Sequence, residues 1–202
     1  DSAPEQPARL NRITAGVHSA LYVGLLGATV GAFFDEETPA GGAVPVGIAA
    51  GLAAGLYVPR MFDRLKWNDA QVRTMGAASV WGGVIGGLFA DSVKKEDTSA
   101  RHVLVGASIG ATLGGLGGAA IARKNQFTKG DVALVDTLAG IGAVGGLTLG
   151  MLMQPAETEA YSVNSIIGTI GGTIIGMVAA PQTNTTQRRM LRVAGVAALG
   201  GA

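Results

Sequence analysis

The chain has 202 residues, of which 15 are Lys or Arg, 14 are Asp or Glu and none is Cys. Its charged fraction of 14% is far below the roughly 25% usual for soluble domains, and 48% of its residues are hydrophobic. This composition excludes intrinsic disorder, and the absence of Cys excludes a disulfide scaffold and a Cys-based zinc site. A formal net charge of +1 without a long basic cluster gives no electrostatic basis for binding nucleic acid.

A polar, proline-containing tail over residues 1–12 precedes a series of stretches without charged residues. A helix needs roughly 20 mainly apolar residues to cross a bilayer, with about 17 to 25 observed, and each stretch fits this range if the last one ends at Pro181. The sequence therefore predicts a membrane domain of six spanning helices over 13–187, followed by a short seventh helical segment over 188–202. The six uncharged stretches are 13–34, 39–59, 74–90, 102–122, 137–156 and 160–187.

The segments between these stretches differ in their content of Lys and Arg. Alternate segments, starting with the N-terminal tail, together hold 12 of the 15 basic residues, and the other set holds 3. Such an asymmetry is typical of helical membrane proteins that keep their basic loops on one side of the bilayer. We therefore expect segments 60–73, 123–136 and 188–192 to lie on the same side as the tail.

The predicted helices repeat as hairpins. Gly82-Gly83 matches Gly145-Gly146 at an offset of 63 residues, and a later run of three glycines recurs at an offset of 58. This self-similarity indicates three antiparallel helical hairpins, over 13–59, 74–122 and 137–181. The predicted fold class is all-α, a polytopic membrane bundle of three repeated hairpins.

Each predicted helix also carries a small residue at every fourth position, which we call a glycine ladder. Ladder residues share one helix face, and glycine inside a helix costs about 1 kcal/mol relative to alanine, so close helix packing must offset that cost. In lipid, small residues at this spacing allow two helix backbones to approach closely. The residues expected to pack helices together are Gly24, Gly51, Gly82, Gly86, Gly110, Gly114, Gly118, Gly146, Gly150, Gly168, Gly172 and Gly176.

With these ladders on every helix, the sequence resembles the glycine-zipper class of bacterial envelope and pore-forming membrane proteins. The resemblance covers the motif on each helix and not the whole chain. It implies close packing in a homo-oligomer.

Motifs for chemistry are weak in this chain. The segment GIGAVG, beginning at Gly140, matches the dinucleotide fingerprint G-x-G-x-x-G, but no acidic residue follows at the distance that ribose binding requires. His18 and His102 are far apart, and neither has further metal ligands at helical spacing. We therefore expect no cofactor, no metal site and no catalytic site.

Polar residues inside or at the start of a membrane span are costly in lipid and are often functional, and the predicted spans contain three such residues. His18 lies within the first span and Asn164 within the last. Asp136 lies near the predicted start of its helix, where a carboxylate either caps the first turn or contributes to a polar path. These three residues are the candidates for a pore.

The function expected from these features is a non-enzymatic integral membrane protein that forms a homo-oligomeric structural or pore-forming assembly. Its partners would be the lipid bilayer, further copies of itself and unidentified proteins of a bacterial cell envelope, with the inner and outer membranes both left open. The alternative is a soluble scaffold of helical hairpins that binds partner proteins.

Overall fold

A computed structural model describes residues 12–34, 43–93, 99–124, 127–153 and 159–200 of the chain. The described residues are almost entirely helical, which confirms the all-α fold class. The elements in chain order are α1 (Arg12–Phe34), α2 (Ala43–Arg64), α3 (Asp69–Val93), α4 (Ala100–Lys124), α5 (Lys129–Met153), α6 (Glu159–Ala179), a 3₁₀ turn η1 (Ala180–Gln182) and α7 (Gln187–Gly200).

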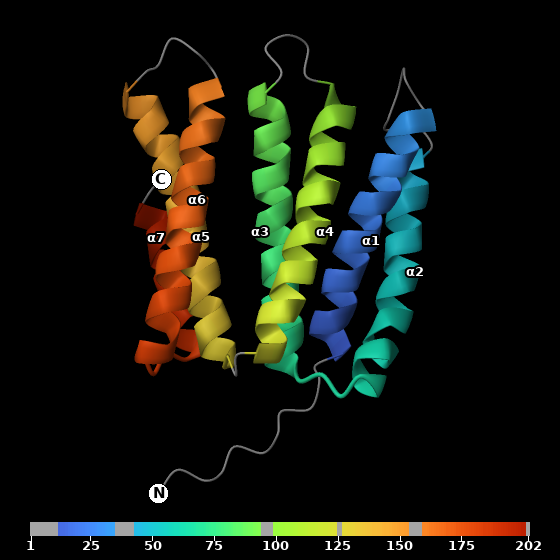
Figure 1. Ribbon diagram of the computed structural model, residues 1–202, viewed down its shortest axis with the longest axis horizontal. Helices are drawn as coiled ribbons and strands as arrows, with labels where there is room; N and C mark the ends of the chain where they lie inside the picture. Colours follow the sequence, from blue (N-terminus) through green and yellow to red (C-terminus); the bar gives the residue numbers. More distant parts are fainter. Residues whose placement is uncertain (1–11, 35–42, 94–98, 125–126, 154–158, 201–202) are drawn as a thin grey trace, which may run out of the picture.

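The six long helices form three antiparallel hairpins, in which α1 packs on α2, α3 on α4 and α5 on α6. Figure 1 shows the hairpins side by side in a row, with the α3–α4 hairpin in the middle. The shorter helix α7 packs on α5, at the outer end of the row. Because each hairpin is made of consecutive helices, the row follows the order of the sequence.

Hydrogen bonds at the first turn fix where the helices begin. Asn68 and Gln71 exchange side-chain-to-backbone hydrogen bonds of 2.9 Å at the start of α3, and Thr128 and Asp131 do the same at the start of α5. These reciprocal capping boxes satisfy backbone N–H groups that would otherwise lack partners. They start both helices before the uncharged stretches at 74–90 and 137–156, so the hairpins are longer than the sequence pattern indicated.

A buried residue recurs at the same position near the start of each unit of the row. Val72, Val132 and Met190 each donate a backbone hydrogen bond to the carbonyl of the capping residue four positions earlier, and all three are buried. Ala15, which is 57 residues before Val72, is also buried at the start of α1. The start of α7 therefore repeats the starts of α3 and α5, which makes α7 the first element of a fourth unit.

Helix α2 ends in a Schellman motif. The N–H groups of Lys66 and Trp67 donate to the carbonyls of Asp63 and Phe62, each over 3.1 Å, and Lys66 adopts a positive φ of 55°. The accompanying apolar contact is between the Phe62 and Trp67 rings, whose centroids are 5.4 Å apart. This motif turns the chain sharply from α2 into the Asn68 cap of α3.

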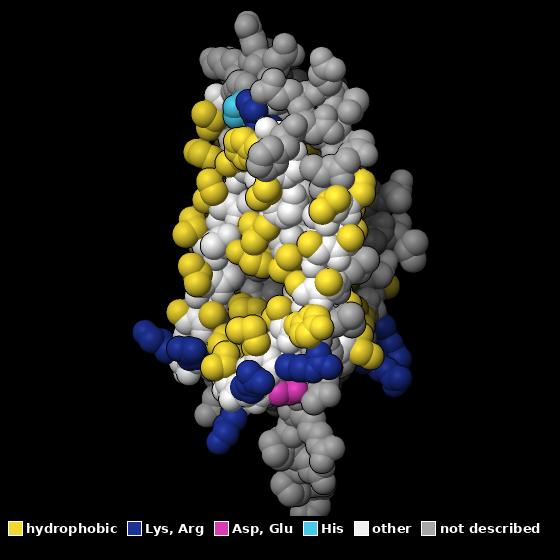
Figure 2. All heavy atoms as spheres, turned by 90° about the vertical axis from the view of Figure 1, so that its right-hand side faces the viewer, with side chains coloured by type: hydrophobic (Ala, Val, Ile, Leu, Met, Phe, Trp, Pro, Cys, Tyr) yellow, Lys and Arg dark blue, Asp and Glu magenta, His cyan; other side chains and the backbone are white. Residues whose placement is uncertain are grey.

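Burial in this protein is inverted relative to that of a water-soluble bundle. Eight of the twelve hydrophobic residues that are buried in the described part of the chain are alanines. Large side chains such as Ile13, Leu116, Leu152 and Ile167 are more than 60% exposed. Figure 2 shows the resulting broad band of hydrophobic side chains on one face, with most of the basic side chains gathered below it at one end.

Four helical segments of the described residues are long and apolar enough to cross a membrane, namely Ile13–Phe33, Ala100–Lys124, Lys129–Met153 and Glu159–Gln182. Helices α2 and α3 are not among them.

Candidate functional site: the interfaces within and between hairpins

The glycine ladders lie at the contact between the two helices of each hairpin. In the central hairpin, a side chain at Gly82 or Gly114 would collide with the backbone of Gly110 or Ala78. In the first hairpin, a Cβ at Gly51 would lie 2.5 Å from the carbonyl oxygen of Ala20. Only glycine permits such an approach of two backbones.

All twelve of the glycines expected to pack helices have atoms of their hairpin partner within 4 Å of where a Cβ would lie. In the third hairpin, for example, a Cβ at Gly176 would lie 2.8 Å from the Cα of Val135. The ladders were also expected to leave surface for contacts between protomers. The ladder glycines described here instead meet a helix of the same chain, so a contact between copies has to use other surfaces.

Neighbouring hairpins are joined by polar side chains as well as by the apolar cluster of Ala15, Phe62 and Val72. Between α1 and α4, the hydroxyls of Tyr22 and Thr112 share a hydrogen bond of 2.8 Å, and those of Thr29 and Ser108 share one of 2.6 Å. Thr29 also donates to the carbonyl of Leu104 over 3.2 Å. A hydroxyl buried among apolar helices gains strongly from such a partner, so these bonds fix how the first hairpin sits against the second.

Asp136 provides a contact between the second and third hairpins. Its Oδ1 accepts a hydrogen bond of 3.1 Å from the Trp81 indole Nε1 on α3. Because α5 begins at Lys129, Asp136 lies two turns inside the helix and does not cap it; the prediction of a cap was wrong. The cap of α5 is the Thr128–Asp131 pair, which starts the helix earlier than its uncharged stretch.

A charged cluster joins all three hairpins at the basic end of the row. Asp69 is fully buried, and its Oδ2 lies 2.9 Å from Lys129 Nζ on α5 and 3.0 Å from Arg73 Nε on its own helix. Arg73 also donates to the Thr14 hydroxyl on α1 over 3.1 Å. A single carboxylate therefore connects the first helices of three successive hairpins.

The two cations decide the ionisation of Asp69. Burial alone raises the pKa of its carboxyl, but hydrogen bonds from Lys129 and Arg73, together with their positive charges, outweigh that effect and hold the pKa below its ordinary value. Asp69 is therefore charged at neutral pH. Its Oδ1 is buried and has no hydrogen-bond partner among the described residues, so Oδ2 makes both contacts with the cations.

The other two polar candidates lie at other helix contacts than Asp136. The His18 ring on α1 packs against α3 where Gly76 leaves room for it. Asn164 lies inside the third hairpin, with its amide nitrogen 3.3 Å from where a Cβ of Gly150 would be. His18, Asp136 and Asn164 thus lie at three different helix contacts.

Sequence reasoning missed the Asp69 cluster and Trp81. A usable signal was present, because Asp69 and Lys129 each follow the capping residue of their helix by one position and have opposite charges. Equivalent positions of adjacent units come close together in a row of repeats.

Among the described residues there is no group of three or more His, Cys, Asp or Glu residues that could hold a metal ion. No protein-family model, curated protein or solved structure matches this chain.

Proposed function

We propose that this chain is a non-enzymatic integral membrane protein of the glycine-zipper class, and that it forms a homo-oligomeric structural assembly in a bacterial cell envelope. The proposed membrane location is supported by the inverted burial. Leu116 and Ile167 face outward along two of the long apolar helices while alanine and glycine fill the interior. In water this arrangement would expose far more contiguous apolar surface than monomeric proteins tolerate.

The same reasoning extends the proposed membrane-spanning region from four helices to six. Helices α2 and α3 pair along their length with α1 and α4, which are themselves long enough to span. A hairpin with one helix in lipid must place the other there too. The charged residues of α2 and α3 lie among the first five or the last five residues of each helix, where they reach the polar interface.

The proposal of an oligomer is based on the exposed side chains at the edges of the row. Helix α2 packs chiefly on α1, and its side chains Val46, Tyr57 and Met61 are between 59% and 69% exposed. A row built from repeated units has two unlike edges, and contact between unlike edges joins copies head to tail into rings or filaments.

A structural assembly is better supported than a pore. Conduction requires polar groups along one continuous path, whereas His18, Asp136 and Asn164 each serve a separate helix contact. A pore would have to form between copies, from surfaces that are apolar in the single chain.

Extraction of cell membranes with alkaline carbonate tests the membrane part. We expect the protein to stay in the pellet, and its release into the supernatant would favour the alternative, a soluble hairpin scaffold that binds partner proteins.

The mass of the particle in mild detergent tests the oligomer. We expect a defined multimer that dissociates when Tyr57 on α2 is replaced by Asp. The matched control is Phe89→Asp, at an exposed position near the end of α3 in the middle hairpin, which should leave the mass unchanged. A monomer for the unmodified chain would contradict the assembly and leave the membrane part intact.

A further inference from the structure

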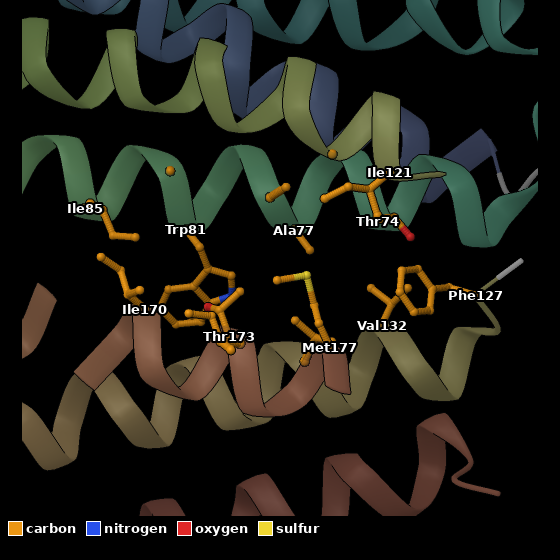
Figure 3. A pocket seen from close by; sticks show the side chains of 15 residues that line it. Thr74, Ala77, Trp81, Ile85, Ile121, Phe127, Val132, Ile170, Thr173 and Met177 are labelled. Carbon is orange, nitrogen blue, oxygen red and sulfur yellow. The ribbon is translucent and has the colours of Figure 1, made fainter. Parts of the chain in front are cut away.

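An apolar groove lies between the second and third hairpins. It has a volume of about 310 Å³, and its wall is formed by side chains of α3, α4, α5 and α6 together with Phe127. Figure 3 shows Ala77, Trp81 and Ile85 of α3 on one side, facing Ile170, Thr173 and Met177 of α6 on the other. Thr74 and Thr173 are the only lining residues with polar side chains apart from the indole of Trp81.

The indole of Trp81 does not make the groove polar, because its Nε1 is already bonded to Asp136. The groove therefore offers almost no hydrogen bonds to an occupant. A long hydrocarbon chain fits such a wall, whereas a polar metabolite would lose its hydration without compensation.

The length and position of the groove match one half of a bilayer. Its lining on α3 runs from Thr74 to Ile85, which is about 16 Å at 1.5 Å per residue. Half of a hydrocarbon core of about 30 Å is about 15 Å. Thr74 lies next to Arg73, at the end of the row where the charged residues begin, so the groove extends from that interface to the middle of the membrane.

Two lysines lie near the interfacial end of the groove. Lys124 is exposed and follows the lining residue Ile121 on α4, and Lys129 follows Phe127, whereas the guanidinium of Arg123 lies 5.8 Å from the centre of the Trp67 ring, toward the first hairpin. The acidic residues at this end are already engaged: Asp69 with Arg73 and Lys129, and Asp131 with the N–H of Thr128. The end therefore carries an excess of positive charge at the depth of lipid headgroups.

From this combination we infer that the groove holds one acyl chain of an anionic phospholipid, whose headgroup is bound by Lys124. The inference rests on the proposed membrane location. The lipid fills the space that remains between the two hairpins beside the contacts of α3 with α5 and α6, and so completes the packing of the row.

Fluorescence of Trp81 reports directly on the groove. The chain has only two tryptophans, so Trp67→Phe leaves Trp81 as the single indole. The protein is placed in phosphatidylcholine vesicles that contain a small fraction of phosphatidylglycerol brominated near the middle of its chains, or the same fraction of equally brominated phosphatidylcholine. Bromine quenches an indole only on contact. We expect saturable quenching by the anionic lipid at concentrations about fivefold lower for each basic residue involved.

Further variants in the Trp67→Phe background separate the groove from the surrounding lipid. Ala77→Leu fills the groove and should abolish the preference for the anionic lipid, whereas the matched control Ala120→Leu, on an exposed position of α4 outside the groove, should keep it. Lys124→Gln should reduce the preference and leave quenching by brominated phosphatidylcholine unchanged, whereas Arg123→Gln, on the other side of α4, should keep the preference.

Equal quenching by the two brominated lipids, or an unchanged preference in Ala77→Leu, would overturn the inference. If the protein still floats with the vesicles in that experiment, the proposed membrane location stands. If it does not float and neither lipid quenches Trp81, the proposed membrane location itself fails.

Discussion

At the scale of single residues, the molecule uses two kinds of contact for two purposes. Glycine removes side chains where the helices of one hairpin meet, as at Gly82 and Gly114. Pairs such as Trp81 with Asp136, or Asp69 with Lys129, join one hairpin to the next. The first kind of contact fits many helices, whereas the second kind requires one particular partner.

The Asp69 pair gives a first prediction about stability. We expect Asp69→Asn and Lys129→Gln each to destabilise the protein, and the double variant to lose about 2 kcal/mol less than the sum, because hydrogen bonds to charged groups are worth about that much. The measurement is reversible unfolding in mild detergent. Strict additivity of the two changes would show that the 2.9 Å contact contributes nothing.

The lowered pKa of Asp69 gives a second prediction, about acid. A carboxyl whose pKa is lower in the folded state stabilises the fold fully above its unfolded pKa of about 3.9, and loses this contribution as the pH falls through the folded value. Below a pH of about 4, we expect the free energy of unfolding to fall less steeply with decreasing pH in Asp69→Asn than in the unmodified protein. An acid dependence that is unchanged in Asp69→Asn would show that this carboxyl does not stabilise the fold.

At the scale of helices, the hairpins could be predicted from the sequence. The exact ends of their helices and the contacts between neighbouring hairpins could not. Ladders repeat every four residues, so they mark a packing face without any knowledge of the partner. The uncharged stretches indicate the part of a helix that suits lipid, whereas capping boxes decide where the helix begins, and this difference placed Asp136 wrongly at a helix start. The Trp81–Asp136 pair could not be foreseen, because a single pair 55 residues apart has no periodic signal.

Two glycines on α4 give a matched prediction. A side chain at Gly114 would meet the backbone of α3 at Ala78, whereas a side chain at Gly117 would meet nothing within 4 Å. Gly114→Leu should therefore destabilise the protein by about 2 kcal/mol or more through overpacking, and Gly117→Leu should stabilise it by up to about 1 kcal/mol through helix propensity. Thermal unfolding, monitored by circular dichroism, distinguishes the expected destabilisation from the expected stabilisation. Similar effects of both variants would mean that the hairpin contact tolerates side chains.

At the scale of the whole molecule, the row has one basic end. The last turns of α2, α4 and α6 lie at the same end of the row as the first turns of α3, α5 and α7, while the last turns of α1, α3 and α5 lie at the other end (Figure 1). This arrangement agrees with the asymmetry of Lys and Arg in the sequence. The basic end should therefore face the side of the membrane that retains positive charge during insertion.

Cysteine labelling tests this orientation, because the chain contains no Cys. A cysteine replacing Lys66, at the basic end, and one replacing Ser99, at the other end, are expected to react with a membrane-impermeant maleimide from opposite sides of a sealed vesicle. Both positions are exposed in the structure. Reaction of both from the same side would contradict the spanning arrangement of α3.

The division between backbone contacts inside hairpins and side-chain contacts between them also bears on the order of events in synthesis. Each hairpin completes its own closest contacts with consecutive helices, so it can enter the bilayer as a unit while later parts of the chain are still being made. The polar pairs that join it to its neighbour form only when the next hairpin arrives. Until then, Asp69 lacks Lys129 and Trp81 lacks Asp136, and a ribosome that stalled between two hairpins would leave an inserted but unsatisfied intermediate open to quality control.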